Sequence, residues 1–298
     1  MALLGLGAIS VPLQHGAPVA QLRPVTAETE PVVIASSVEH LDDAVELALT
    51  GHLPRRLVVF DFRSGLDDHR DALAAATTRL AATAVAVETL ADVVSRGSAP
   101  PMTPWVEVDD DAPALLIHTA GSTGISIGAM YTVMEVTAPW RQANTSAVSS
   151  AAAFPAITLN YLPMSHVVGR SVLHQTLGAG GTAYFVAASD LSTFFDDLSL
   201  LRPTRLNFEP QIWDMLVQLF HGEVDRRSPD GADRRTVEAD VLVKMREKLL
   251  GGRFTSAVTT SAPISSGTRS FIESLVDMHV TDGHGLGYFR TDAARPQG

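Results

Sequence analysis

The chain has 298 residues, of which 46% are hydrophobic and 18% charged, and this composition is typical of a folded protein rather than a disordered one. A formal net charge of -11 argues against nucleic acid as a partner, because contact with a phosphate backbone needs a basic face. The absence of cysteine excludes disulfide bonds, thiolate zinc sites and a cysteine nucleophile. Because a cysteine-free chain suits a reducing compartment, we predict a cytoplasmic location.

The first hundred residues alternate short β-branched runs with amphipathic segments, which is the βαβ pattern of a parallel sheet. The apolar stretch 1–13 has no basic residue and is too short to span a bilayer, so we predict buried core there and no membrane span. Apolar residues of 39–49 recur at helical spacing, which predicts one stripe packed against the sheet. The other expected elements are strands at 32–35, 57–60 and 84–87 and a helix over 68–82. Thr89 and Asp92 have the spacing of a helix cap.

Residues 97–113 are rich in Gly, Ser, Pro and Asp without any period, and we interpret them as a surface connection. A strand at 114–118 follows, and then a Gly/Ser/Thr loop that runs to Gly128, at the end of a strand where open α/β sheets bind ligands. Further strands are expected at 157–162, 182–186, 205–208 and 254–259, with helices over 211–220 and 237–249. The sequence therefore predicts an α/β fold of layered sheet-and-helix subdomains, followed by an unstructured tail over 286–298.

The loop over 119–128 reads Thr-Ala-Gly-Ser-Thr-Gly-Ile-Ser-Ile-Gly. Small residues of this kind let a backbone wrap closely around oxyanions, and the hydroxyls of Thr119, Ser122 and Thr123 would add donors. A flexible turn is the alternative interpretation. The loop lacks the G-x-x-x-x-G-K-[ST] arrangement, so the P-loop of nucleoside triphosphatases is excluded.

Residues 119–131 resemble the phosphate loop of AMP-forming acyl ligases, in the carboxylic acid reductase version Thr-Ser-Gly-Ser-Thr-Gly-Thr-Pro-Lys-Gly-Ala-Met-Tyr. Later blocks resemble the same family in the same order, at 160–166, 206–208, 212–215 and 261–265. The resemblance covers residues 1–285. It implies a partial AMP-binding (adenylation) domain, namely most of the large N-terminal part of such a domain, truncated at both ends.

The resemblance implies an enzyme that uses ATP and magnesium, in which a carboxylic acid attacks the α-phosphate to give an acyl adenylate. By motif position, the residues that would cradle the phosphates are Thr119, Gly121, Ser122, Thr123, Gly124 and Gly128. Those implied to line the nucleotide and acyl cleft are Ser261, Ala262, Pro263, Asp282, Gly283, His284 and Gly285. His166 would stand near the carboxylate as the catalytic residue, where an imidazole can hydrogen-bond the attacking oxygen. The alternative for His166 is a cap on the following helix.

Several positions depart from the family pattern and remove charge. Ile127 stands where the family loop has its lysine, and Tyr288 stands where the family has a magnesium-ligating glutamate. A phenol is a poor substitute for a hard carboxylate ligand, so the magnesium site is expected to be lost. His284 and Gly287 replace an adenine-packing aromatic residue and a phosphate-binding threonine, and no part of the sequence resembles the family's mobile C-terminal lid.

These departures predict an ATP-dependent carboxylate-adenylating fragment that is catalytically impaired. The alternatives are a degraded-gene product without activity and a module that binds a nucleotide or an acyl group. The sequence leaves the acid substrate and the oligomeric state open.

The remaining polar residues favour structural roles. His174 and His221 have no metal-ligand spacing, and no metal site is predicted from them. Asp190, Asp196 and Asp197 flank a predicted helix, as capping and solvated residues do. The two lysines of the chain, Lys244 and Lys248, lie one turn apart on a polar helix face.

Overall fold

The computed structural model describes residues 2–14, 16–99, 101, 104–120, 126–149, 155–186, 190–228 and 233–283. The chain divides into two compact units, Met1–Val108 with Leu116–Ala129, and Asp109–Leu115 with Met130–Gly298. The division after Val108 falls within the stretch 97–113, where the sequence predicts a surface connection. Residues 98–112 of this stretch contain no helix or strand among those that the structure describes.

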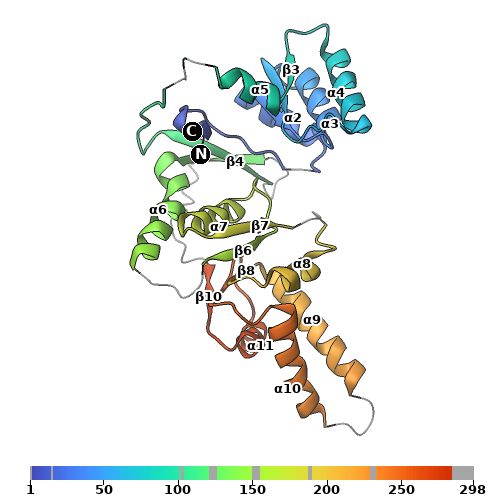
Figure 1. Ribbon diagram of the computed structural model, residues 1–298, viewed down its shortest axis with the longest axis vertical. Helices are drawn as coiled ribbons and strands as arrows, with labels where there is room; N and C mark the ends of the chain where they lie inside the picture. The colour runs from blue at the N-terminus through green and yellow to red at the C-terminus, as the bar shows by residue number, and fades with distance from the viewer. Residues whose placement is uncertain are drawn as a thin grey trace, which may run out of the picture. The chain divides into compact units, whose positions relative to one another are not determined.

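The first unit contains a parallel sheet in the order β1-β2-β3, formed by β1 (Val33–Ser36), β2 (Arg56–Val59) and β3 (Ala86–Thr89) (Figure 1). The intervening helices are α3 (Leu41–Thr50) and α4 (Asp67–Leu80), and α2 (Val19–Thr29) precedes the sheet. Of the apolar stripe expected on α3, Leu49 is 44% exposed, whereas Leu41, Ala44, Val45 and Ala48 are buried. These residues pack with Leu57, Val59 and Leu80 into one core, so the βαβ prediction is confirmed.

Helix α5 (Leu90–Gly97) begins with the predicted cap. The Thr89 hydroxyl accepts from the Asp92 amide at 3.2 Å, and the Asp92 carboxylate accepts from the Thr89 amide at 3.0 Å. The Thr89 hydroxyl also donates to Asp92 Oδ2 at 2.6 Å, and this bond, together with the one from the Thr89 amide, lowers the pKa of Asp92 because both favour the charged carboxylate. A reciprocal capping box therefore fixes where β3 ends and α5 begins.

The prediction of buried core at the start of the chain is wrong. The side chains of Leu3, Leu6 and Ile9 are 51%, 49% and 48% exposed. Helix α1 (Ala2–Gly5) is a single turn, too short to present an apolar stripe to a core. It is held instead by a backbone bond from the Val106 amide to the Gly5 carbonyl, at 2.9 Å.

Strands β4 (Pro113–Ala120) and β5 (Ser126–Thr132) form a two-stranded sheet. The predicted loop therefore ends earlier than expected, because residues 126–128 already belong to β5. A Cβ at Gly128 would lie 3.0 Å from Leu116 Cδ1 and 3.2 Å from His118 Cε1. Glycine thus allows the two strands to approach at this position. Residues 121–125 lie outside the described part of the chain.

The described residues of the second unit form two parallel sheets. One sheet pairs β6 (Ile157–Asn160) with β7 (Thr182–Phe185). The other sheet has the order β10-β9-β8. Its strands are β8 (Arg205–Phe208), β9 (Ser256–Thr259) and β10 (Val280–Asp282). The sheets meet where the Ile157 amide donates to the Thr204 hydroxyl at 2.8 Å. All four strands predicted for this part of the sequence are present, with ends shifted by up to two residues.

The helices of this unit are α6 (Val133–Ser149), α7 (Val167–Gly178), α8 (Phe194–Leu201), α9 (Pro210–Arg227), α10 (Arg234–Lys244) and α11 (Ser266–Val276). Alternate residues of β8 and β9 are buried, which directs Leu206, Phe208 and Ala257 into one apolar core. Trp213 and Leu216 of α9 fill this core and are completely buried. No helix in the described ranges is long and apolar enough to cross a membrane.

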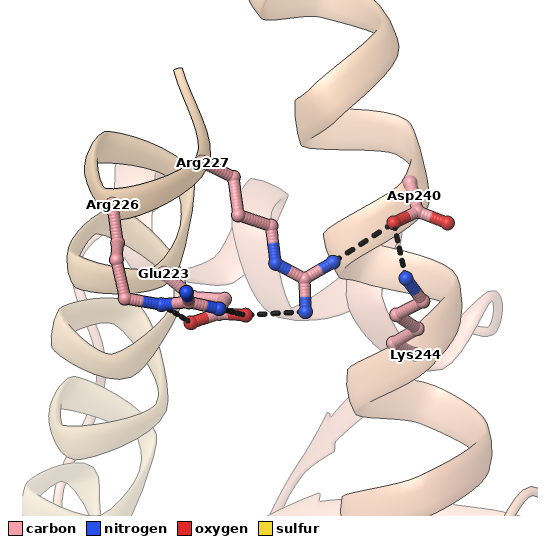
Figure 2. Close-up of polar contacts among 5 residues, drawn as sticks. All are labelled: Glu223, Arg226, Arg227, Asp240 and Lys244. Atoms are coloured by element: carbon pink, nitrogen blue, oxygen red, sulfur yellow. Dashed lines mark hydrogen bonds and ion pairs between the residues drawn. The ribbon is translucent and has the colours of Figure 1, made fainter. Parts of the chain in front are cut away.

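Helix α9 is longer than the predicted 211–220. Polar residues and Gly222 follow Phe220 and obscure the apolar period, although Val224, four residues on, is fully buried. Figure 2 shows the ion pairs that join the end of α9 to α10: Arg227 contacts both Glu223 and Asp240, and Asp240 also accepts from Lys244 at 2.7 Å. The pKa of Glu223 falls to about 2, chiefly because Arg226 hydrogen-bonds its carboxylate.

The predicted helix 237–249 is confirmed with one change. Residues Met245–Leu249 form a π turn after α10, in which the Leu250 amide donates to the Met245 carbonyl at 2.9 Å. Met245 and Leu250 are both buried in the core, with exposed fractions of 8% and 0%.

Candidate functional site

The carboxyl ends of β8, β9 and β10 lie along one edge of a parallel sheet. Glu209 directly follows β8, Thr260 and Ser261 follow β9, and Gly283 follows β10. In open α/β sheets ligands bind at this edge, because the connecting backbone leaves amides and side chains there without strand partners. We call the residues Glu209, 260–263 and 282–283 the carboxyl edge.

The turn after β9 has an unusual backbone. Ser261 has a φ of 67°, in the left-handed region that non-glycine residues seldom occupy. The Ala262 amide closes the turn by donating to the Thr260 carbonyl at 2.8 Å, and the Thr260 amide donates to the Phe208 carbonyl at 2.9 Å. Strained conformations of this kind persist where surrounding contacts determine them, and they are frequent at functional sites.

Glu209 supplies one of those contacts. The Ser261 hydroxyl donates to Glu209 Oε1 at 2.5 Å, across 52 positions of sequence. The backbone amide of Glu209 in turn donates to the Tyr161 hydroxyl oxygen at 2.8 Å. Tyr161 follows β6 and packs edge-on against Phe194, with ring centroids 5.1 Å apart. Its burial raises the pKa of the phenol, so the hydroxyl stays neutral.

The end of β10 packs tightly against the end of β9. A Cβ at Gly283 would lie 2.8 Å from the Thr259 carbonyl oxygen, so only glycine fits this approach. The neighbouring Asp282 carboxylate contacts Arg269 Nη2 at 2.5 Å, and Arg269 Nη1 also donates to the Val280 carbonyl at 2.6 Å. Arg269 of α11 therefore ties the last strand to the helix that covers it.

Two hydroxyls at this edge lack a hydrogen-bond partner among the described residues. Thr259 and Thr260 are 0% and 1% exposed, and neither Oγ1 atom has a bond. A buried hydroxyl without a partner carries a free-energy cost. The Thr260 hydroxyl is thus a donor that a ligand or an ordered water at the edge could satisfy.

His166 is the N-cap of α7. Its Nδ1 atom accepts from the Val168 amide at 3.3 Å, which agrees with the capping interpretation of this residue. Because Nδ1 acts as acceptor, neutral His166 carries its proton on Nε2, where it can be donated. The ring is exposed, so capping and a contact with a ligand are compatible.

The structure brings together only part of the predicted site. Ser261, Ala262, Pro263, Asp282 and Gly283 lie at the carboxyl edge described above. Thr119 is in β4 and Gly128 in β5, in the other unit. The remaining predicted residues, together with the tail over 286–298, are outside the described ranges: Gly121, Ser122, Thr123, Gly124, His284 and Gly285.

Sequence reasoning missed Glu209 and Arg269 altogether, and it gave no role to Tyr161. The available signal for Glu209 was its place immediately after the predicted strand 205–208. Nothing local indicates that its partner would be Ser261, because the contact depends on how β8 and β9 pair.

The other polar candidates have structural partners. His174 is half-buried and its Nδ1 lies 3.1 Å from the Val136 carbonyl oxygen, while burial lowers the pKa of its ring. Asp190 accepts from the Ser192 amide at 2.9 Å, and hydrogen bonds from the side chain and the amide of Ser192 lower its pKa. Within the described ranges, no group of three or more His, Cys, Asp or Glu residues could hold a metal ion.

Comparison with known proteins places the chain in a family. The sequence profile described as AMP-binding enzyme matches residues 1–287. The chain belongs to this family of AMP-binding enzymes. It is 50% identical to a carboxylic acid reductase of Mycobacterium tuberculosis, over all of this chain and 28% of that protein. A carboxylic acid reductase of Mycobacterium marinum is 47% identical over the same shares.

Solved structures of AMP-binding enzymes share the fold. The adenylation domain of a carboxylate reductase from Mycobacterium chelonae matches 97% of this chain and 44% of that chain, with a TM-score of 0.86 and 40% identity. The adenylation domain of the Segniliparus rugosus carboxylic acid reductase, in complex with AMP and a co-purified carboxylic acid, matches 94% of this chain and 45% of that chain, with a TM-score of 0.82 and 44% identity. The α/β fold predicted for part of an adenylation domain is therefore confirmed, and the chain spans less than half of these domains.

Proposed function

We propose that this chain is a carboxylate-adenylating fragment that binds the adenine nucleotide and a carboxylic acid but turns over poorly. The observation that carries the proposal is the carboxyl edge of a member of the AMP-binding family, where Ser261 and Gly283 lie beside a Thr260 hydroxyl that has no partner among the described residues. The likeness to an adenylation domain solved with AMP and a carboxylic acid supports both ligands. We extend the proposal to a cytoplasmic location, on the absence of cysteine.

The carboxyl edge suits the nucleotide better than a metal ion. The Thr260 hydroxyl, which has no partner among the described residues, is a donor that a base or a phosphate can use. The two carboxylates of the edge are already engaged, Glu209 by Ser261 and Asp282 by Arg269. These residues do not make a magnesium site, so the proposal routes no step through the metal.

Two departures from the family pattern would lower the rate of adenylation. In this reaction, negative charge develops between the α-phosphate and the pyrophosphate, and cationic partners stabilise it. Ile127 offers no charge where the family has lysine, and Tyr288 offers a phenol where the family has glutamate. Losing one preorganised electrostatic partner typically costs about 10²- to 10³-fold in rate. Backbone amides and hydroxyls of the loop do not depend on these side chains, so nucleotide affinity should survive better than turnover.

The deciding experiment is carboxylate-dependent exchange of labelled pyrophosphate into ATP, with a panel of aromatic and aliphatic acids. We expect exchange near the no-enzyme control for the natural chain. The double variant Ile127→Lys, Tyr288→Glu should raise the exchange rate, since it returns the missing charges. Robust exchange by the natural chain, abolished by Ser122→Ala and Thr123→Ala, would show that the chain is a competent enzyme and contradict the impairment.

A module that binds without catalysis is the second candidate, and the Thr260 hydroxyl at the edge favours it over a product without any function. Thermal melting with AMP separates the two alternatives, because a ligand that binds only the native state raises the melting temperature. A shift that appears with AMP and is lost in Ser122→Ala supports binding. No shift at millimolar AMP would leave the chain without a nucleotide site.

A further inference from the structure

The carboxyl edge depends on one residue that family motifs did not indicate. We propose that Glu209 is the positioning residue of this edge, whose carboxylate holds Ser261 in the left-handed turn that a bound ligand would meet. The inference rests on the proposed nucleotide and acyl site, and it assigns to that site the residue that sets its shape. It stands on the contacts among Tyr161, Glu209 and Ser261.

The first step is the conformational preference of Ser261. An L-residue with a φ of 67° is strained, and serine has no glycine-like freedom to relieve that strain. The closing bond from the Ala262 amide to the Thr260 carbonyl, at 2.8 Å, is local and spans a single residue. A tertiary contact is therefore needed to select this turn over the extended backbone that serine prefers.

The second step is that Glu209 is itself fixed. Its main chain is anchored at the end of β8 by the bond to the Tyr161 hydroxyl, and Tyr161 is held among the aromatic rings of Phe194 and Phe208. The carboxylate can accept a strong bond from a hydroxyl, and Glu209 Oε1 accepts one from Ser261. Glu209 thus links the end of β6 to the ends of β8 and β9, which are two of the three strands whose carboxyl ends form the edge.

The third step concerns what the turn presents. Thr260 precedes Ser261, and its buried hydroxyl has no partner in the described part of the chain. If Ser261 relaxed to an extended backbone, the peptide planes on either side would rotate and the Thr260 hydroxyl would move away from the edge. Holding Ser261 therefore also fixes a ligand-binding donor that Glu209 does not contact.

The test compares Glu209→Ala with Glu209→Gln, using Glu247→Ala at an exposed position as the control. The glutamine amide oxygen can still accept from Ser261, whereas alanine cannot. We expect the Ala262 amide to exchange about tenfold faster in Glu209→Ala, with Glu209→Gln and the control near the natural rate. Titration with AMP should show affinity about tenfold weaker for Glu209→Ala and nearly unchanged for Glu209→Gln.

A second variant keeps the test decisive if Glu209→Ala does not fold. Ser261→Gly adopts the left-handed turn without help, so it should retain AMP affinity although the bond to Glu209 is gone. Three outcomes would each overturn the positioning role. The first is equal AMP affinity in Glu209→Ala and the natural chain, and the second is an equal loss of AMP affinity in Glu209→Gln and Glu209→Ala. The third is a Ser261→Gly chain that no longer binds AMP. If the natural chain itself does not bind AMP, the proposed function fails, while exchange at Ala262 still decides the role of Glu209.

Discussion

Replacing Gly283 by alanine should loosen the carboxyl edge. The added Cβ would lie 2.8 Å from the Thr259 carbonyl oxygen, 3.3 Å from Val258 Cγ1 and 3.4 Å from Thr260 Cα. Carbon and oxygen atoms in such contacts normally sit about 3.3 to 3.6 Å apart, so the end of β10 must move by roughly 0.5 Å or more. The obstructing oxygen belongs to the backbone of β9 and cannot rotate aside, so we expect a cost of about 1 to 3 kcal/mol in the free energy of unfolding.

The matched control is Gly222→Ala in α9. This glycine is exposed within the helix, and a Cβ there would meet nothing within 4 Å. Alanine should stabilise the helix by about 0.5 to 1 kcal/mol, so the two variants should differ by about 1.5 to 4 kcal/mol. The change from glycine to alanine is thus expected to lower the free energy of unfolding at position 283 and to raise it at position 222.

Urea unfolding followed by the fluorescence of the buried Trp213 measures both effects. Trp105 and Trp140 are replaced by phenylalanine in every chain compared, so the signal reports the second unit. With a slope of about 3 kcal/mol per molar urea, Gly283→Ala should lower the midpoint by about 0.3 to 1 M. A Gly283→Ala midpoint at or above that of the parent chain, with Gly222→Ala raised as expected, would refute the close approach of β10 to β9.

Three further outcomes follow from single contacts. The pKa of Tyr161 is raised in the folded chain, so the stability linked to its neutral hydroxyl is complete below about pH 10 and is lost as the pH rises above it. The urea midpoint of Tyr161→Phe should therefore fall less steeply than that of the parent chain between about pH 9 and pH 11. Parallel slopes would contradict this. Thr89→Ala should cost about 1 kcal/mol by removing the cap of α5, and Thr89→Ser should restore most of it in thermal melts. Arg226→Gln should move the pKa of Glu223 up from about 2 toward 4.5 in a carboxyl NMR titration, and an unmoved pKa would rule out Arg226 as the cause. In the natural chain, the stability linked to Glu223 is present above about pH 4.5 and is lost as the pH falls toward 2.

Local sequence patterns predicted the elements whose burial follows a simple period. The stripe on α3 and the strand β8 were found because alternating or helical spacing of apolar residues reports which face meets the core. The cap at Thr89 was also found, since both partners lie within four residues. The end of α9 was missed because polar residues and Gly222 separate Phe220 from Val224 and obscure the apolar period, although Val224 is buried in the core.

In the candidate site, too, local motifs predicted some residues and missed a tertiary contact. Motif order drew attention to Ser261 and Gly283, but the contact that shapes the edge joins Glu209 to a residue 52 positions away. Such a contact depends on the register of β8 against β9, a tertiary property. The prediction of buried core at the start of the chain was wrong for a related reason. Apolar residues such as Leu3 and Leu6 are buried only where another surface packs against them, and here they are exposed.

The π turn at Met245–Leu249 holds one residue more than an α-helical turn between two buried side chains. In a regular α-helix, side chains five positions apart point about 140° away from each other, so Met245 and Leu250 could not share a face. The wider turn returns them to the same side, and both enter the core. Removing one residue between them would restore α-helical spacing, in which side chains four positions apart are again only about 40° apart. Either of these two lengths leaves the same two anchors facing inward, so we expect the backbone to absorb the deletion of one residue here.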